Sequence, residues 1–173
     1  MLKFFMFDEY CVDVLGIDLK KLWDAGKRVI LTDLDNTLVG SDVADPTDEA
    51  RRFLAEAKEI GFKVYIVSNN HRIRVERFAR DLDVDGAHYL ACKPFRSKVR
   101  KVLSGYDVGE CVFIGDQLMT DVFVAKRLDL HAILVKPVNF KGDGGFTKVN
   151  RWLERRVVRG LRRRGLPVPG HME

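Results

Sequence analysis

Short apolar runs alternate with amphipathic stretches along this chain from residue 28 onward. The runs are rich in β-branched and aromatic residues and almost continuously apolar, which is typical of strands buried on both faces of a sheet. This pattern predicts five strands, at residues 28–35, 63–69, 87–93, 111–116 and 131–135. Strand–helix alternation with short links predicts a three-layer α/β fold, in which a five-stranded parallel sheet has helices on both faces.

Helical periodicity fills the intervals between the strands. The predicted helices cover residues 46–60 and about 71–82, 95–103 and 119–128. In the first of them, Asp45 is the expected N-cap, Pro46 the first helical residue and Gly61 the residue just past the end. Its apolar face consists of Phe53, Leu54, Ala57 and Ile60.

Polar groups follow the carboxyl ends of the predicted strands, where parallel sheets bind their ligands. They are Asp33 and Asp35, Ser68 and Asn69, Lys93, and Asp116. Residues i and i+2 of a strand point the same way, so Asp33 and Asp35 should both lean into the crevice above the sheet. A parallel neighbour would bring Ser68 alongside, and Lys93 and Asp116 would converge there. Carboxylates without histidine or cysteine suit Mg²⁺ rather than zinc.

Each of these residues alone has a structural alternative. An Asp-x-Asp pair is more often a solvated turn than a catalytic pair, and Asp116, like Ser68 with Asn69, could cap a helix. Their joint occurrence, in order and each at a strand exit, favours a site. Lys93 and Lys136 both precede proline after a strand, and the spacing to the following Gly-Asp motif favours Lys93.

Cysteine and histidine usage argues against a disulfide framework and against a zinc site. The three cysteines, Cys11, Cys92 and Cys111, are widely spaced and form no Cys-x-x-Cys pair, which favours a reducing cytoplasm. Cys92 and Cys111 lie in predicted strands and are expected to be buried, inert thiols. His71 and His131 are expected to be a helix-start residue and a strand residue.

The order of the polar motifs resembles the haloacid dehalogenase (HAD) superfamily of aspartate-nucleophile phosphatases, which have a Rossmann-like fold. The matching stretches are Thr-Asp-Leu-Asp-Asn-Thr-Leu, Val-Ser-Asn-Asn, Lys-Pro and Ile-Gly-Asp-Gln-Leu-Met-Thr-Asp. The resemblance implies that Asp33 attacks phosphorus to form an aspartyl-phosphate, and that Asp35 protonates the leaving oxygen and later activates water. It also implies that Ser68 and Asn69 bind the phosphoryl oxygens and that Lys93 holds the nucleophile and the phosphate charge.

The same resemblance implies a Mg²⁺ site. Asp33, Asp116 and the main-chain carbonyl of Asp35 would bind the ion, while Asp121 would steady its coordination shell or pair with Lys93. Elementary electrostatics agrees, because a carboxylate approaches a phosphate dianion only where a metal ion and an ammonium group screen the two anions.

The chain of 173 residues is expected to form one domain, with an N-terminal segment at 1–27, a catalytic core at 28–140 and a tail at 141–173. The net charge is −1 for residues 1–140 and +6 for the tail. Charged residues interrupt the apolar runs, and acids lie within the apolar N-terminal segment. Neither a transmembrane span nor a secretory signal is therefore predicted.

The tail has the pattern of a basic amphipathic helix. Its apolar positions are Phe146, Val149, Trp152, Leu153, Val157 and Leu161, and its arginines are Arg151, Arg155, Arg156, Arg159, Arg162, Arg163 and Arg164. Such a helix would lie on an anionic bilayer, with Phe4, Phe5 and Phe7 beside it. Alternatively, its apolar face packs on the edge of the sheet and the arginines are only solvated. The two arrangements are compatible.

Only one helix and one strand fit between Asp35 and Ser68, and again between Ser68 and Lys93, so no cap domain is expected. An open site suits a macromolecule, a lipid head group, or a small molecule covered by another subunit. Within the superfamily, the chain is similar to the capless (subclass IIIA) YqeG-type phosphatases and to the mitochondrial enzymes that dephosphorylate phosphatidylglycerophosphate. This implies a Mg²⁺-dependent lipid phosphate monoesterase, cytoplasmic and peripheral on the inner face of the membrane.

Two alternatives stay open. One is a phosphatase for nucleotides, sugar phosphates or nucleic-acid ends, although the tail offers no interleaved aromatic platform for nucleic acid. The other is a non-catalytic binding module with the same fold. The presence of all four residues argues against a non-catalytic module, because a site that no longer catalyses a reaction does not need an acid at position 35. The four are Asp33, Asp35, Lys93 and Asp116.

Overall fold

The computed structural model describes residues 2–139 and 145–169, with side chains described from residue 152 onward in the second range. Within these residues, the centre is a six-stranded parallel sheet in the order β1-β6-β5-β2-β3-β4. The strands are β1 (Glu9–Cys11), β2 (Val29–Thr32), β3 (Lys63–Val67), β4 (Gly86–His88), β5 (Cys111–Gly115) and β6 (His131–Val135). The predicted parallel α/β fold is confirmed, but with six strands instead of five, because the N-terminal segment supplies β1 beside β6.

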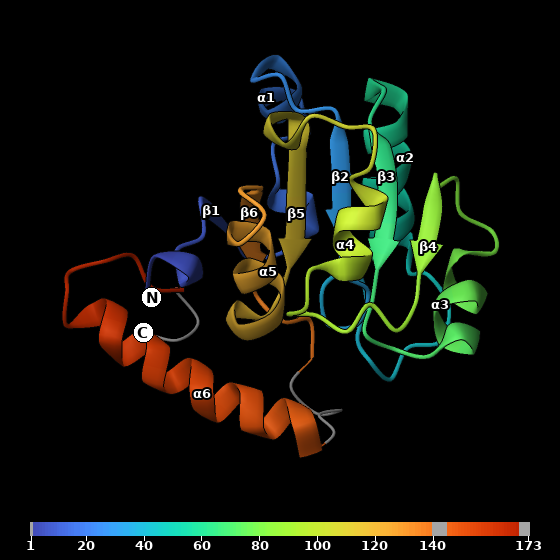
Figure 1. Ribbon diagram of the computed structural model, residues 1–173. Helices are drawn as coiled ribbons and strands as arrows, with labels where there is room; N and C mark the ends of the chain where they lie inside the picture. The colour runs from blue at the N-terminus through green and yellow to red at the C-terminus, as the bar shows by residue number, and fades with distance from the viewer. Residues whose placement is uncertain (1, 140–144, 170–173) are drawn as a thin grey trace.

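Helices cover both faces of the sheet (Figure 1). One face packs against α1 (Leu19–Asp24), α2 (Asp48–Ile60) and α3 (Arg72–Ala79), and the other against α4 (Ser97–Val102) and α5 (Phe123–Lys126). A further helix, α6 (Gly145–Arg162), contributes Val158 to the second core. Short 3₁₀ turns lie at Leu2–Phe5 (η1), Val14–Gly16 (η2) and Val108–Glu110 (η3), and a π-helical turn at Leu118–Val122 (η4). Successive strand residues face opposite cores, so that Ile30 belongs to the first and Leu31 to the second.

The start of α2 differs from the prediction. Its N-cap is Thr47, whose Oγ1 accepts a hydrogen bond of 3.3 Å from the backbone of Ala50. Asp45, the expected cap, instead forms an ion pair of 3.0 Å with Arg77 of α3. The predicted end is confirmed, because Gly61 has a φ of +116° and its N–H closes the last turn.

The segment after β4 also differs from the prediction. The strand ends at His88, so Lys93 lies in a loop instead of at a strand end. Cys92 is exposed, with a φ of +55°, and the expectation of a buried thiol there is wrong. Cys111 is buried in β5 as predicted, His71 directly precedes α3, and His131 begins β6.

The tail forms α6, which lies beyond the strand arrowheads in Figure 1 and contacts η1 and η4. Its buried side chains are Glu154, Val158 and Leu161, whereas Trp152 is 50% exposed. The packed face is therefore displaced from the predicted one. The tail packs on the protein core, and its contact with a bilayer stays a prediction. The predictions for Phe146, Val149 and Arg151 lie outside the described side chains. Among the described residues, no helix has the length and apolarity needed to cross a membrane.

Candidate active site

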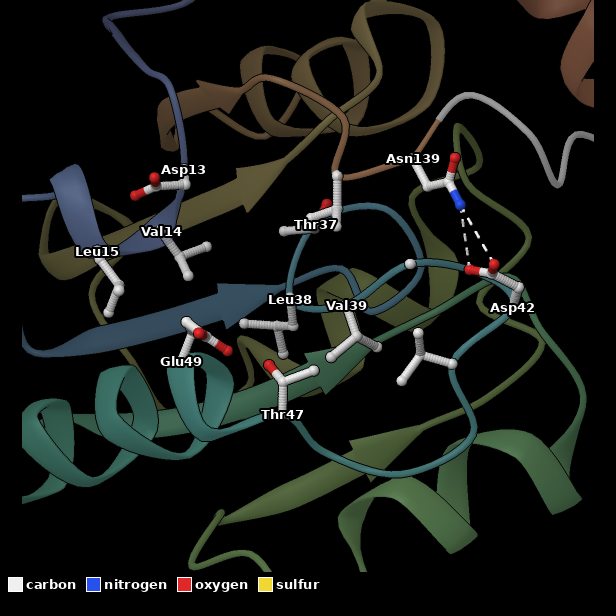
Figure 2. A pocket seen from close by; sticks show the side chains of 13 residues that line it. Asp13, Val14, Leu15, Thr37, Leu38, Val39, Asp42, Thr47, Glu49 and Asn139 are labelled. Carbon is white, nitrogen blue, oxygen red and sulfur yellow. Dashed lines mark hydrogen bonds between the residues drawn. The ribbon is translucent and has the colours of Figure 1, made fainter.

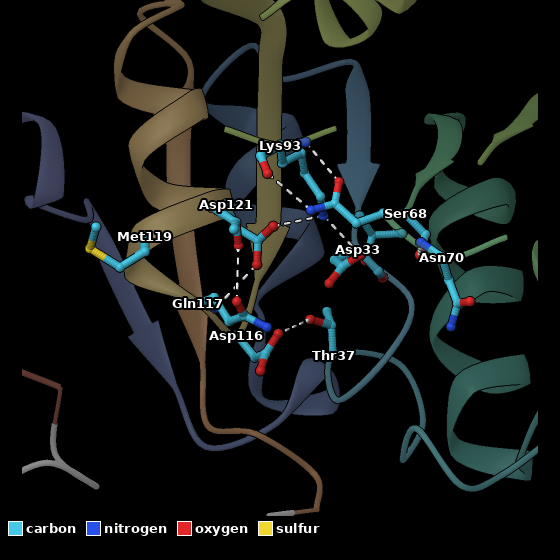
Figure 3. Close-up of polar contacts among 12 residues, drawn as sticks. Asp33, Thr37, Ser68, Asn70, Lys93, Asp116, Gln117, Met119 and Asp121 are labelled. Atoms are coloured by element: carbon cyan, nitrogen blue, oxygen red, sulfur yellow. Dashed lines mark hydrogen bonds and ion pairs between the residues drawn. The ribbon is translucent and has the colours of Figure 1, made fainter. Parts of the chain in front are cut away.

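Three buried carboxylates meet at the carboxyl end of the sheet. Asp33 follows β2, Asp116 follows β5, and Asp121 lies in η4 (Figure 3). Each offers an oxygen, and these oxygens all lie within 4.8 Å of one another. This geometry agrees with the expectation that Asp33 and Asp116 meet at one edge of the sheet, and Asp121 joins them there.

Lys93 neutralises part of this cluster. Its Nζ lies 2.8 Å from Asp33 and 2.7 Å from Asp121, and its side chain is 1% exposed. Burial alone would lower the pKa of Lys93, but the Asp121 and Asp33 carboxylates outweigh that effect and raise it. The ammonium group is therefore held charged. The Lys93–Pro94 peptide bond is cis.

Asn69 fixes the backbone that carries this lysine. Its Oδ1 accepts from the Lys93 N–H at 2.7 Å, and its Nδ2 donates to the Lys93 carbonyl at 3.0 Å. Both ends of the amide are used in this way, so the phosphate contact predicted for Asn69 stays a prediction. Ser68 is buried at the end of β3, and its Oγ accepts from the Asn70 N–H at 3.1 Å.

The remaining negative charge in the cluster is poorly compensated by protein groups. Asp116 Oδ1 accepts a hydrogen bond of 3.4 Å from Thr37, while its buried Oδ2 has no hydrogen-bond partner among the described residues. Burial, and then the nearby Asp121 and Asp33 carboxylates, raise the pKa of Asp116 well above its usual range. Burial likewise raises the pKa of Asp33 to about 7, although Lys93 opposes the shift. An orphaned carboxylate oxygen among three acids fits a hard divalent cation.

The π-helical turn that carries Asp121 is held both by contacts near β5 and by a hydrogen bond to Glu154 of α6. Asp121 Oδ2 accepts from the Gln117 N–H at 3.1 Å, and a side chain at Gly115 would collide with Asp121. From the tail, buried Glu154 accepts from the backbone N–H of Leu118 at 2.7 Å. The π-helical turn thus receives a carboxylate from α6 at its amino end, which satisfies N–H groups that would otherwise be buried without a partner.

Asp35 is not one of the three clustered carboxylates, and its partners come from α3 and from the loop before it. Its Oδ1 accepts from Arg74 at 3.0 and 3.2 Å, and its Oδ2 accepts from Asn70 at 2.9 Å. Because β2 ends at Thr32, strand alternation does not apply to Asp33 and Asp35, and the lean of Asp35 into the crevice stays a prediction. The chain then turns sharply at Asn36, which has a φ of +64°.

Four residues of the site were missed by sequence reasoning. They are Thr37, Asn70, Arg74 and Glu154. Thr37 and Asn70 stood inside the quoted motifs and were open to prediction. Arg74 lies in the first turn of α3, where one arginine among several gave no signal, and Glu154 was noticeable only as an acid inside an arginine-rich helix.

An apolar cavity of about 390 Å³ is lined by residues that follow β1, β2 and β6 in the chain (Figure 2). Thr37 links the cavity to the carboxylate cluster, because it lines the cavity and also hydrogen-bonds Asp116. The apolar lining comes from Val14, Leu15, Leu38, Val39, Val43 and Val138. At its rim, Asn139 donates to Asp42 at 3.2 and 3.3 Å, which ties the loop after β6 to the loop after β2.

Solved structures with this fold include two bacterial proteins. The crystal structure of an uncharacterized protein from Listeria monocytogenes serotype 4b is 17% identical with a TM-score of 0.54, and the match covers 68% of this chain and 85% of that one. The 3-deoxy-D-manno-octulosonate 8-phosphate phosphatase from Moraxella catarrhalis, in complex with magnesium ion, phosphate ion and KDO, is 14% identical with a TM-score of 0.51. That match covers 81% of this chain and 91% of the other.

Sequence comparisons give the family. A model of the haloacid dehalogenase-like hydrolases matches residues 14–129. The chain is also 40% identical over 165 residues to the probable phosphatase YqeG of Bacillus subtilis (strain 168), a match that covers 94% of this chain and 95% of that protein. With the acidic cluster and Lys93 at the expected end of the sheet, the chain belongs to the haloacid dehalogenase-like hydrolases, as a phosphatase of the YqeG type.

Proposed function

We propose that this phosphatase is a Mg²⁺-dependent monoesterase of lipid phosphates, which converts phosphatidylglycerophosphate to phosphatidylglycerol at the inner face of the membrane. The observation that carries the lipid assignment is the distribution of exposed apolar side chains at the end of the sheet that holds the carboxylate cluster. The reaction class rests on the family and on the cluster itself.

In the proposed chemistry, Asp33 attacks phosphorus, the ester P–O bond breaks, and an aspartyl-phosphate forms on Asp33. The leaving alkoxide takes its proton from Asp35, which then accepts a proton from the water that releases phosphate. Lys93, charged and 2.8 Å from Asp33, stabilises the transferring phosphoryl group. Asp33, Asp116 and Asp121 would hold Mg²⁺, whose positive charge stabilises the transition state when it is bound.

Most of the large apolar side chains that are exposed come shortly after the carboxyl end of a strand in the chain. Among the described residues, the exposed ones are Val12, Leu15, Val43, Ile73, Leu90, Phe95, Val138 and Trp152. Val12, Leu90 and Val138 lie within three residues of the carboxyl end of a strand, and Ile73 and Phe95 within seven. Because the sheet is parallel, these strand ends share one edge. Ile73 is 83% exposed and Phe95 69%. Apolar groups gathered around a catalytic edge favour contact with a membrane surface.

The tail adds positive charge near the same edge. The helix periodicity places Trp152, Arg156, Arg159 and Arg163 opposite the face that packs on the core, and all four are exposed. Arg156 lies 5.1 Å from the centre of the Trp152 ring. Basic groups close to an anionic bilayer contribute about 1 kcal/mol each, and tryptophan prefers the interface. The arginines would therefore orient the catalytic edge toward anionic lipid.

A side-by-side substrate panel tests the assignment. Purified protein in Mg²⁺ is given phosphatidylglycerophosphate in vesicles, nucleotides, sugar phosphates and a generic aryl phosphate, and phosphate release is compared as kcat/KM. We expect the lipid phosphate to exceed every soluble substrate. Equal or faster turnover of a nucleotide or a sugar phosphate would replace the lipid assignment with that substrate class.

A further inference from the structure

Arg74 is the cationic group on the leaving-group side of the proposed reaction. Its Nε and Nη2 contact Asp35 Oδ1 at 3.2 and 3.0 Å, and its Nη1 donates to the carbonyl of Ala44 at 2.7 Å. The side chain is 15% exposed, and the guanidinium lies 5.7 Å from the centre of the Phe78 ring. The group is therefore anchored by the protein while part of it still reaches solvent.

This guanidinium has N–H donors that no protein group among the described residues uses. An arginine carries five N–H groups. Three of these N–H groups, one each on Nε, Nη1 and Nη2, donate to the partners just named. The second N–H of Nη1 and the second N–H of Nη2 therefore have no partner among the described residues. Arg77, the next arginine of α3, has a different partner: its Nε and Nη2 donate to the two carboxylate oxygens of Asp45.

We propose that Arg74 binds a second anionic group, carried by the leaving alcohol of the substrate, and that a phosphodiester is its natural ligand. This inference rests on the proposed function, in which Asp35 contacts the leaving oxygen. One hydrogen bond from that oxygen to Asp35 and one from Asp35 to Arg74 together span about 6 Å. An anion separated from the leaving oxygen by a three-carbon glycerol unit falls within this reach, and guanidinium groups bind phosphate oxygens in pairs.

The proposal distinguishes between lipid phosphates. Phosphatidylglycerophosphate places its phosphodiester in the leaving alcohol, so Arg74 would contribute to its recognition. Phosphatidate releases diacylglycerol, which carries no charge, and would gain nothing from Arg74. The subsite therefore predicts selectivity for a doubly phosphorylated head group over a singly phosphorylated one, independently of the acyl chains.

The experiment uses a deacylated pair of substrates, so that it does not depend on membrane binding. The kcat/KM for glycerophosphoglycerol phosphate is divided by that for glycerol 3-phosphate, in the wild type and in the variants R74A, R74K and R77A. We expect the wild-type ratio to exceed ten, to fall about tenfold or more in R74A, and to be partly kept in R74K. R77A removes the other link between α3 and the loop before α2, and it should keep the ratio within twofold.

Two results would overturn the proposal. One is a wild-type ratio near one, which needs no variant to be informative. The other is an equal loss on both substrates in R74A, which would mean that Arg74 serves only to hold Asp35 and the Ala44 loop. Inhibition of aryl phosphate hydrolysis by glycerophosphoglycerol, strong in the wild type and weak in R74A, gives a second measurement with a substrate whose leaving group carries no second anion. The vesicle panel decides the lipid assignment separately from this ratio.

Discussion

Lys93 lies 2.8 Å from Asp33 and is almost fully buried with it, so the proposed nucleophile has a fixed ammonium partner before any substrate arrives. The same lysine contacts Asp121 at 2.7 Å, which leaves Asp116 without a cation among the described residues. The site is thus preorganised, but its three carboxylates outnumber the one ammonium group that contacts them among the described residues. A divalent cation would complete it, and this determines how the site should respond to mutation and to pH.

Replacing Asp33 with asparagine should abolish turnover without unfolding the protein. Asparagine does not form the acyl phosphate, so we expect a loss of at least about a thousandfold in kcat. Burial raises the pKa of Asp33 from its usual value of 3.8 to about 7. The free energy of unfolding therefore falls as the pH rises to about 7, because the carboxyl ionises readily in the unfolded chain but not in its buried site. At pH 8 without metal, D33N should therefore be as stable as the wild type within about 1 kcal/mol, or more stable. Urea unfolding checks this, and residual wild-type activity would identify another nucleophile.

Mg²⁺ binding should be weaker at low pH. The raised pKa values of Asp33 and Asp116 mean that protons compete with the ion in the metal-free protein. Below pH 7 the dissociation constant should rise by up to about tenfold per pH unit for each proton displaced. Calorimetry in buffers of different ionisation enthalpy should show proton release on binding. Affinity that is constant between pH 6 and pH 8 would place the metal outside this cluster.

The fold was more predictable than the side-chain partners in the site. Buried parallel strands carry continuous apolar runs, so β6 was predicted at its observed bounds. Three-residue β1 lies in a segment with no such run, and its place depends on pairing with β6, which local sequence does not encode. Strand bounds also matter for the site: β2 was predicted to extend to residue 35 but ends at Thr32, so strand alternation does not determine the orientation of Asp35.

Long-range partners explain the other misses. Glu154 is buried against Leu118, and nothing near either residue in sequence predicts that contact. Asp45 and Thr47 are both good N-caps; Thr47 caps α2, and Asp45 instead pairs with Arg77 from another helix, a partner that local sequence does not reveal. By contrast, Asp33, Lys93 and Asp116 were predictable because each follows a strand or its loop at one edge of the sheet.

Glu154→Ala should destabilise the protein, although the residue lies in the tail. The change leaves the buried N–H of Leu118 without its acceptor, which costs about 1–3 kcal/mol. E154Q is the matched control, because its amide oxygen still accepts the bond, and it should recover most of the loss. Thermal and urea unfolding of both variants check this. Equal stability of E154A and the wild type would mean that α6 does not fasten the turn that carries Asp121.

Replacing the three outward arginines Arg156, Arg159 and Arg163 with glutamine should weaken binding to anionic liposomes. All three are exposed and lie away from the packed face, so the fold should be unaffected. At about 1 kcal/mol for each charge, we expect at least a tenfold loss of affinity at low ionic strength. The difference should shrink as salt is added, because salt screens exposed charges. Sedimentation with vesicles measures it, and unchanged binding would assign the arginines to another role.

Replacing Ile73 and Phe95 with serine should separate lipid turnover from chemistry. Both side chains are exposed at the catalytic edge, where burial in the interface would recover free energy from their apolar surface. We expect kcat/KM on phosphatidylglycerophosphate vesicles to fall about tenfold, while hydrolysis of a soluble aryl phosphate stays within twofold. Lys20→Ser is the control, because Lys20 is equally accessible but lies on α1, which leads into the amino end of β2. If the double variant keeps full activity on vesicles, or loses both activities together, the apolar edge does not contact the membrane and lipid phosphate must reach the carboxylates by another approach.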